Sequence, residues 1–294
     1  MKRILPFLLF CPLLATAHPL EGRIWDTRSH SFVSADAVYA QAAASHFLLL
    51  GETHDNATHH RLQREALEAL AQRGRKPALA LEQLDSENQA SLDTARQQGT
   101  RDPEQLADAG RFDREGWDWP LYRDLIGHAA QYDWPLLAAN LSRSATRDIA
   151  RGKLEPALPA ASPEQLKAIE QDIVEGHCNQ RPEDGLLQRM VTAQRARDAH
   201  IAKMLDGSGN EGAVLIAGAS HVRRDSAVPR YLTASRPSLV VAFIEVQAGE
   251  ETPEAYADGA FDILWFTPPE KRDDPCVGFT APGLPPAQAD AKAG

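Results

Sequence analysis

The chain has 294 residues, of which 43% are hydrophobic and 24% charged, a composition typical of a globular protein with one large domain or two modest ones. It carries 41 Asp and Glu against 31 Lys and Arg, which gives a formal net charge of −10 at pH 7. Because an acidic chain repels phosphate backbones, the charge argues against nucleic-acid binding.

The first 17 residues predict a secretory signal peptide. Met1-Lys2-Arg3 is basic, residues 4–14 are apolar, and Ala15-Thr16-Ala17 is a small-residue cleavage site. The apolar run is too short to cross a bilayer, so we expect cleavage after Ala17 and a periplasmic or secreted mature protein. A lipoprotein acylated at Cys11 is the less favoured alternative, because a phenylalanine precedes this cysteine where a lipobox has a small residue.

Six short apolar runs bounded by turn residues predict strands, over residues 47–52, 77–84, 135–141, 213–220, 238–246 and 261–267. The first five are continuous rather than alternating, which is typical of strands covered on both faces. Helical patterns lie between them, including one that ends at Gly74 and a long one over about residues 184–205. This alternation predicts an α/β fold with a mostly parallel sheet flanked by helices.

The stretch from about residue 141 to residue 180 has no strand pattern and contains a helix start at Ser162-Pro163, so we expect a helical insertion beside the sheet. Residues 281–294 have the composition of a disordered tail. The prediction is therefore a single α/β domain over residues 18–280, with the insertion as a small helical subdomain.

Removal of the signal peptide leaves two cysteines, Cys178 and Cys276. In an oxidising compartment such a pair most simply forms a disulfide. Closing a loop of about 100 residues would stabilise the fold by about 4–5 kcal/mol in the chain-entropy model. A metal–thiolate site is the weaker alternative, because the two cysteines lack CxxC spacing.

Polar side chains follow the predicted strands where a ligand site is expected, because open α/β sheets bind ligands at the carboxyl ends of their strands. Glu52 and His54 leave the first strand, Glu82 is the charge within the second, and His221 follows the fourth. Each histidine comes three residues after a glycine, which permits a sharp backbone exit or the close approach of a ligand. The GxxH spelling alone is weak, but its place directly after an apolar strand in both cases indicates a shared cleft.

Two imidazoles and two carboxylates that converge on a cleft suit several chemistries. They are suitable ligands for zinc, iron or manganese, and they also suit a general base with its orienting partner in hydrolysis. An imidazole also suits a haem iron, with Arg223 or Arg224 neutralising a propionate and Tyr122 or Tyr231 as phenolate alternatives. Trp117 is expected to pack in the core or at a domain interface, with cofactor stacking as the alternative. The alternative is a purely structural role, in which these side chains only form hydrogen bonds with one another and with backbone amides at the strand ends.

A set of longer segments carries a family resemblance: "LLLGETHDNATHHRLQ", "WDWPLYRDLIGHA", "PLLAANLSR", "GHC", "VLIAGASHVRRDSAVPRYL" and "KRDDPCVGF". These segments, spread over about residues 47–279, resemble the ChaN family of bacterial iron-regulated haem-binding proteins. That family is grouped with Tiki proteases, TraB proteins and erythromycin esterases, whose hallmark is two GxxH motifs and an acidic residue on another strand. The hallmark corresponds here to residues 51–54, residues 218–221 and Glu82. The second motif reads Gly-Ala-Ser-His, whereas relatives often have Gly-Asn-Gly-His.

The resemblance implies an α/β fold with a small helical subdomain, haem as the cofactor, and a role in haem or iron uptake at the bacterial envelope. It also implies a haem-mediated homodimer and envelope haem-uptake components as partners. We therefore expect a periplasmic haem-binding protein that holds haem in a cleft above the strand ends, with His54, His221 and Tyr231 as candidate iron ligands.

Two alternatives remain beside this expectation. The first is a metal-dependent hydrolase, a peptidase or esterase of the Tiki type, that uses Glu52, His54, Glu82 and His221. The second is a binding module in which the titratable cluster is structural.

Overall fold

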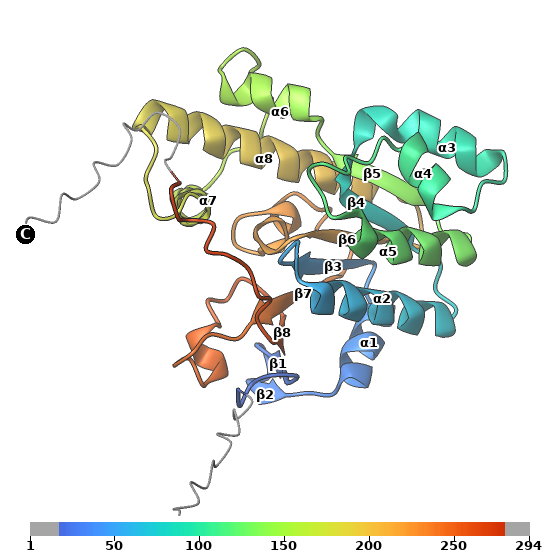
Figure 1. Cartoon of the computed structure of the whole chain (residues 1–294), viewed down its shortest axis with the longest axis horizontal. Helices are drawn as coiled ribbons and strands as arrows, with labels where there is room; N and C mark the ends of the chain where they lie inside the picture. Colours follow the sequence, from blue (N-terminus) through green and yellow to red (C-terminus); the bar gives the residue numbers. More distant parts are fainter. Residues whose placement is uncertain (1–17, 280–294) are drawn as a thin grey trace, which may run out of the picture.

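The computed structural model describes residues 18–279, in which an eight-stranded sheet is covered by helices on both faces (Figure 1). The strand order is β2-β1-β8-β7-β3-β6-β4-β5. The strands are β1 (Ile24–Asp26), β2 (Ser31–Phe32), β3 (Phe47–Glu52), β4 (Ala78–Asp85), β5 (Leu136–Asn140), β6 (Ala213–Gly218), β7 (Ser238–Glu245) and β8 (Ile263–Thr267). The strands from β8 to β5 are mutually parallel, whereas β1 is antiparallel to β8 and β2 to β1. The predicted α/β fold with a mostly parallel sheet is confirmed.

Helices connect these strands along the described part of the chain. The α-helices are α1 (Ala35–Ala44), α2 (Ala57–Gln72), α3 (Gln89–Gln97), α4 (Pro103–Ala109), α5 (Trp119–Gln131), α6 (Arg143–Ala150), α7 (Pro163–Gly176) and α8 (Asp184–Asp206). Short 3₁₀ turns are η1 (Ser86–Asn88), η2 (Ala219–Val222), η3 (Val228–Arg230) and η4 (Pro253–Ala255).

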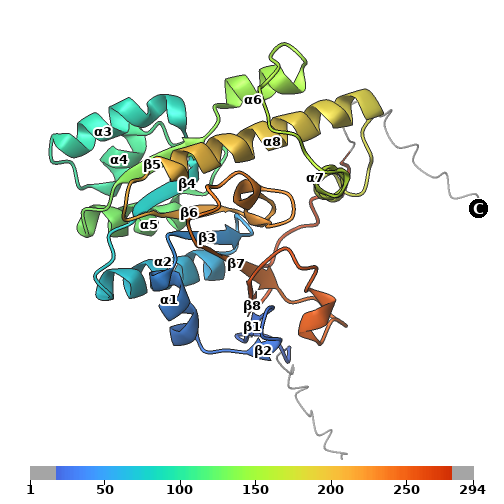
Figure 2. The same ribbon diagram turned by 180° about the vertical axis from the view of Figure 1, so that it is seen from behind.

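The two faces of the sheet bury separate hydrophobic cores, because successive strand residues point to opposite faces. In β3, Leu48 and Leu50 belong to the core shared with α1 to α5, whereas Phe47 and Leu49 belong to the core shared with α8. Figures 1 and 2 show α2 and α5 on one side of the sheet and α8 on the other. Burial on both faces explains why these strands read as continuous apolar runs.

The differences between predicted and observed strands lie at their ends. The strand predicted over residues 213–220 ends at Gly218, because the next four residues form η2. The strand predicted over residues 261–267 begins at Ile263. The hairpin of β1 and β2 was not predicted, since strands of three and two residues are too short to produce a pattern.

The stretch predicted as a helical insertion, about residues 141–180, contains α6 and α7, and both pack against α8. The predicted signal peptide, residues 1–17, and the predicted tail, residues 281–294, lie outside the described residues. Within the range that the structure describes, no helix is both long enough and apolar enough to cross a membrane.

The segment after β8, residues 268–279, runs back across the molecule towards α7, and we call it the C-terminal strap (Figure 1, red). Cys276 in the strap forms a disulfide with Cys178, which follows α7, and their Cα atoms are 5.4 Å apart. The predicted pairing of the two cysteines is thereby confirmed.

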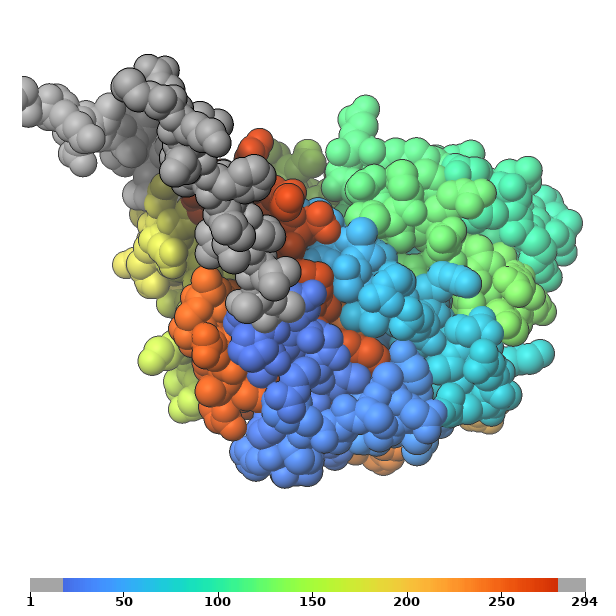
Figure 3. All heavy atoms as spheres, turned by 60° about the horizontal axis from the view of Figure 1, so that its bottom comes forward, coloured from blue at the N-terminus to red at the C-terminus, as the bar shows by residue number. Residues whose placement is uncertain are grey.

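Arg272 attaches the strap to the turn after β3 and to the end of β7. Its guanidinium forms ion pairs of 2.7 Å with Asp55, in the turn after β3, and with Glu245, the last residue of β7. Figure 3 shows the red strap against the segment that leads into α2. The strap therefore links the turn that carries His54 to the end of α7.

Candidate functional site

The two GxxH turns lie side by side, because β3 and β6 are neighbouring parallel strands in which Glu52 is level with Gly218. A Cβ atom on Gly218 would lie 2.9 Å from Nε2 of His54, closer than real Cβ contacts come. A Cβ atom on Gly51 would lie 2.5 Å from Cγ2 of Val222, in the turn after β6. Each glycine therefore makes room for the chain that leaves the other strand, which explains why the two motifs occur together.

Glu52 is a buried carboxylate held by several side chains. Its Oε1 accepts hydrogen bonds from the hydroxyl of Tyr122 at 2.6 Å and from Nδ1 of His54 at 2.9 Å. Its Oε2 accepts one from Nε2 of Gln63 at 2.6 Å. Burial by itself raises the pKa of Glu52, but the hydrogen bond from His54 and the charge of His60 outweigh it, so the pKa is lowered. Glu52 is therefore ionised, and these donors fix its position.

The second ring nitrogen of His54, Nε2, lies next to Gly218, on the side of Glu82. An ionised carboxylate only accepts hydrogen bonds, so Nδ1 of His54 carries a proton towards Glu52, and Nε2 holds the lone pair whenever the ring is neutral. Within residues 18–279, no group forms a hydrogen bond with this Nε2, and the side chain is 42% exposed. The ring meets Trp117 edge to face, with centroids 4.7 Å apart. Burial lowers the pKa of His54, but the hydrogen bond to Glu52 and the charge of Glu82 raise it overall.

Glu82, on β4, also lies close to Gly218: its Oε2 would be 3.7 Å from a Cβ atom on that glycine. This Oε2 accepts a hydrogen bond from the backbone N–H of Gly218 at 2.8 Å, and Oε1 forms an ion pair of 2.6 Å with Arg197 of α8. Nε2 of His221 is 3.3 Å from Oε1 of Glu82, and its Nδ1 is 2.6 Å from Oδ1 of Asp198. The predicted second histidine thus lies between two carboxylates.

His221 has no free ring nitrogen in this arrangement. Burial lowers its pKa, but the charges of Glu82 and Asp198 outweigh burial and raise the pKa to about 9. The ring is therefore an imidazolium at neutral pH, and its side chain is only 4% exposed. With both nitrogens protonated, His221 has no lone pair for a metal or for a haem iron.

The two arginines that the sequence suggested for a propionate are already paired with aspartates. Arg223 forms ion pairs of 2.8 Å with Asp225 and with Asp258. Nε of Arg224 donates to Asp262 at 2.7 Å. Their charges are therefore neutralised within the fold.

Tyr231, the phenolate candidate, is partly buried beside α7 and α8. Its hydroxyl accepts hydrogen bonds from Nε2 of Gln165 at 3.3 Å and from Nε of Arg195 at 3.4 Å. The structure thus brings together the four predicted residues Glu52, His54, Glu82 and His221. Tyr231, Arg223 and Arg224 instead pair with other side chains. In residues 18–279, no group of three or more His, Cys, Asp or Glu side chains is arranged to hold a metal ion.

Sequence reasoning missed four positioning roles: those of Tyr122 and Gln63 as donors to Glu52, and those of Arg197 and Asp198 of α8. Asp198 is fully buried and lies three and seven residues before Ile201 and Leu205, on the buried stripe of the helix. An aspartate at such spacing within an apolar stripe is the signal that would have found it.

A cavity of about 340 Å³ lies beside this cluster, and we call it the rim cavity. It is lined by residues from the end of β4, the loop before α5, the end of β5 and the start of α6. Its lining includes Glu82, which belongs to the buried cluster, and Trp117, which contacts His54. The rim cavity therefore lies beside two neighbours of His54, Trp117 and Glu82.

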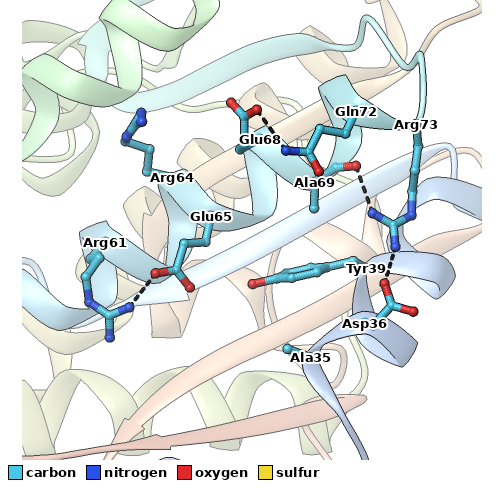
Figure 4. Close-up of a pocket in the computed structure, with 10 residues that line it drawn as sticks. All are labelled: Ala35, Asp36, Tyr39, Arg61, Arg64, Glu65, Glu68, Ala69, Gln72 and Arg73. Carbon is cyan, nitrogen blue, oxygen red and sulfur yellow. Dashed lines mark hydrogen bonds and ion pairs between the residues drawn. The ribbon is translucent and has the colours of Figure 1, made fainter.

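A larger hollow of about 660 Å³ lies between α1 and α2, with Tyr39 between the two helices (Figure 4). Its charged groups pair largely with one another, as in the ion pairs of Arg61 with Glu65 and of Arg73 with Asp36. None of its lining residues comes from the carboxyl end of a strand. It is therefore separate from the cluster of the GxxH turns.

Comparison with known proteins gives one family match. A family described as "Haem-binding uptake, Tiki superfamily, ChaN" matches residues 38–232, a range that contains both GxxH turns, Glu82 and α8. No curated protein matches the chain.

Among solved structures, the chain is similar to one described as "Cofacial heme binding to ChaN of Campylobacter jejuni", with 25% identity and a TM-score of 0.71. That similarity covers 82% of this chain and 95% of the other. A type III effector, HopBA1, is similar at 16% identity with a TM-score of 0.47, over 80% of this chain and 93% of the other.

Proposed function

This chain belongs to the ChaN family of haem-binding uptake proteins in the Tiki superfamily, and from that membership we propose that it is an envelope protein that binds haem and serves haem or iron uptake. Haem is the ligand that the family assigns to it. The finer proposal is that haem is held at the carboxyl ends of β3, β4 and β6, where the two GxxH turns meet.

One observation supports this location: the side chain of His54 is 42% exposed and its Nε2 forms no hydrogen bond within the described residues, while Nδ1 is bound to the ionised Glu52. Carboxylates hold metal-binding histidines in the same way, because the hydrogen bond fixes the ring and increases the basicity of the free nitrogen. If haem binds here, Nε2 of His54 would be the group that contacts its iron. Tyr122 and Gln63 keep Glu52 in place, so this residue set fits the group.

Binding energy would come mainly from the porphyrin faces, at about 25 cal/mol per Å² of apolar area removed from water. Trp117, which lies against His54 and lines the rim cavity, is the aromatic side chain best placed to cover a porphyrin edge. The proposed roles are therefore iron contact for His54, orientation for Glu52 and apolar cover for Trp117.

The decisive experiment is a hemin titration of the mature protein, followed at the Soret band. We expect saturable binding in the wild type and a shifted band with weaker binding in His54→Ala. His30→Asn is the matched control, because His30 is an exposed histidine with a positive φ of 49° that asparagine tolerates. Tyr231→Phe should leave the band unchanged. A band that changes in Tyr231→Phe and not in His54→Ala would assign the iron to the phenolate instead.

The envelope location is proposed from the predicted signal peptide and is tested separately. Cell fractionation and N-terminal sequencing should give a periplasmic protein that begins at His18. Metabolic labelling with palmitate, in wild type and in Cys11→Ser, distinguishes the lipoprotein alternative, which predicts a label that depends on Cys11.

A haem-mediated homodimer is the proposed assembly, and uptake components of the envelope are the proposed partners. Light scattering of the purified protein should give a monomer mass without hemin and twice that mass at one hemin per chain. A mass that does not respond to hemin would contradict the shared-haem dimer without affecting haem binding.

Metal-dependent hydrolysis remains a second candidate, because a histidine oriented by a buried carboxylate is also how a general base is held. The test is an assay with peptide and ester substrates in the presence of zinc, iron(II) or manganese. Turnover that disappears in both Glu52→Gln and His54→Ala would support it. No turnover with any of these metals would eliminate it.

A further inference from the structure

Two consecutive histidines in the first turn of α2, His59 and His60, are both buried. Each ring reaches back to the backbone of the turn after β3. Nδ1 of His59 lies 2.9 Å from the backbone nitrogen of Thr53, and Nε2 of His60 lies 2.9 Å from the carbonyl oxygen of His54. Neighbouring side chains of one helix therefore hold the backbone on both sides of the His54 side chain.

His59 is the acceptor in its contact with the turn. A backbone N–H only donates, so Nδ1 of His59 has the lone pair and Nε2 has the proton, which it donates to Oγ1 of Thr267 at 2.9 Å. Burial lowers the pKa of His59 to about 4, against the opposing charges of Glu245 and Glu52. The ring is therefore neutral, with one fixed tautomer that joins the turn to the end of β8.

His60 is the donor in its contact. A backbone carbonyl only accepts, so Nε2 of His60 donates to the oxygen of His54. The ring of His60 meets that of Tyr122 edge to face, with centroids 4.7 Å apart, so packing also fixes its direction. The two histidines thus use different nitrogens in different roles: His59 accepts through Nδ1, and His60 donates through Nε2.

The backbone needs these contacts because the strand has already ended. β3 ends at Glu52, so the N–H of Thr53 lies beyond the strand pairing, and Nδ1 of His59 replaces a strand partner. The carbonyl of Thr53 accepts from the backbone N–H of Asn56 at 3.0 Å. Together with the contact of His60, these hydrogen bonds set the direction in which the side chain of His54 leaves the chain.

We infer that His59 and His60 are positioning residues of the proposed haem site, and that they fix the backbone from which His54 reaches the iron. The inference rests on the proposed haem-binding function and adds two residues that act through His54. Both side chains are buried, so neither of them contacts the ligand.

The experiment uses amide side chains that replace one imidazole nitrogen at a time. The amide of asparagine comes close to the position of Nδ1, and the amide of glutamine, on its longer stem, to that of Nε2. His59→Asn should therefore keep the acceptor for Thr53 and bind hemin as wild type does. His59→Gln should bind hemin about tenfold more weakly, the effect of one lost hydrogen bond.

At His60 the order should reverse, because the atom that makes the contact is Nε2. His60→Gln should bind hemin as wild type does, and His60→Asn about tenfold more weakly. This crossed order separates positioning from a general effect on the helix. Glutamine is the better helix former, so a purely structural role predicts that glutamine is preferred at both positions.

Urea unfolding of the same variants measures stability separately from affinity. His128 is the matched control, because it is also a buried histidine on a helix but lies beside Glu68, on a later turn of α2. His128→Asn and His128→Gln should bind hemin equally. The same preferred amide at His59 and His60, wild-type affinity in all four variants, or an affinity that simply follows the free energy of unfolding would overturn the inference and leave haem binding intact.

The contact of His59 can also be tested without hemin. NMR of the ring nitrogens in histidine-labelled protein should show His59 as a neutral ring with its proton on Nε2 at neutral pH. A proton on Nδ1 would overturn the inference, whatever the protein binds. Failure of wild type to bind hemin at all would overturn the proposed function itself, and this inference with it.

Discussion

Nδ1 of His54 donates to Oε1 of Glu52 over 2.9 Å, and this hydrogen bond determines which nitrogen of the imidazole is left without a partner. Glu52 is in turn held by Tyr122 from α5 and by Gln63 from α2. The orientation of one exposed side chain therefore depends on two helices that do not contact the ligand in the proposed complex.

Glu52→Gln should weaken hemin binding about 10- to 100-fold, the usual effect of removing the carboxylate behind a metal-binding histidine. The glutamine keeps the size of the side chain but removes the charge that fixes the proton on Nδ1 of His54. Titration at the Soret band measures the effect. Glu68→Gln is the control, because Glu68 also lies on α2 but pairs with Gln72, Tyr132 and His128 rather than with His54. We expect no change in affinity. Wild-type affinity in Glu52→Gln would show that His54 does not need this orientation.

Gly218→Ala should destabilise the protein by about 1–3 kcal/mol, because the new methyl group would overlap the imidazole of His54. Hemin binding should weaken as well, since His54 has to move. Urea unfolding and hemin titration measure the two effects. Gly127→Ala is the matched control: it lies inside α5, its Cβ would come no closer than 3.9 Å to a neighbour, and it should stabilise the helix by about 0.5–1 kcal/mol.

The clamp formed by Arg272 and Glu245 should weaken in acid. Burial raises the pKa of Glu245, but hydrogen bonds from Arg272 and Asn56 outweigh it and lower the pKa to about 2. A lowered carboxylate pKa stabilises the fold above the unfolded pKa of about 4.5 and loses that effect as the pH falls towards 2. Because both groups of the ion pair are partly exposed, solvent screening limits the contribution at neutral pH to about 1 kcal/mol.

The check is urea unfolding of wild type and Glu245→Gln at pH 6, 4.5 and 3.5, roughly the range over which a free glutamate titrates. The difference in unfolding free energy should be largest at the highest pH and should shrink at the lowest. A difference that stays constant over this range would contradict the assigned linkage.

Reduction of the disulfide between Cys178 and Cys276 should lower the free energy of unfolding by about 2–4 kcal/mol, because the unfolded chain then regains the freedom of a long loop. The measurement is urea unfolding with and without a phosphine reductant. The variant Cys178→Ser/Cys276→Ser should resemble the reduced wild type and should not respond to the reductant. A response in that variant would point to an effect of the reductant elsewhere.

The sheet could be predicted because its central strands are buried on both faces, which leaves an apolar run wherever such a strand occurs. The GxxH turns could be predicted because they follow those runs directly. Arg223 and Arg224 could not be assigned from the sequence, since Asp258 and Asp262 come more than 30 residues later and spacing alone does not reveal such pairs.

The C-terminal strap has a consequence for the order in which the protein matures. Asp55 and Arg272 are separated by 217 positions in the sequence. The turn that carries His54 and Asp55 is therefore synthesised long before Arg272, which binds it. During synthesis, the β3 turn emerges from the ribosome long before the residue that fixes it. The proposed haem site is therefore completed only after Arg272 has been synthesised. A truncated chain that stops at Thr267 would retain every residue of the paired motifs but would lack Arg272 and Cys276, which attach the strap.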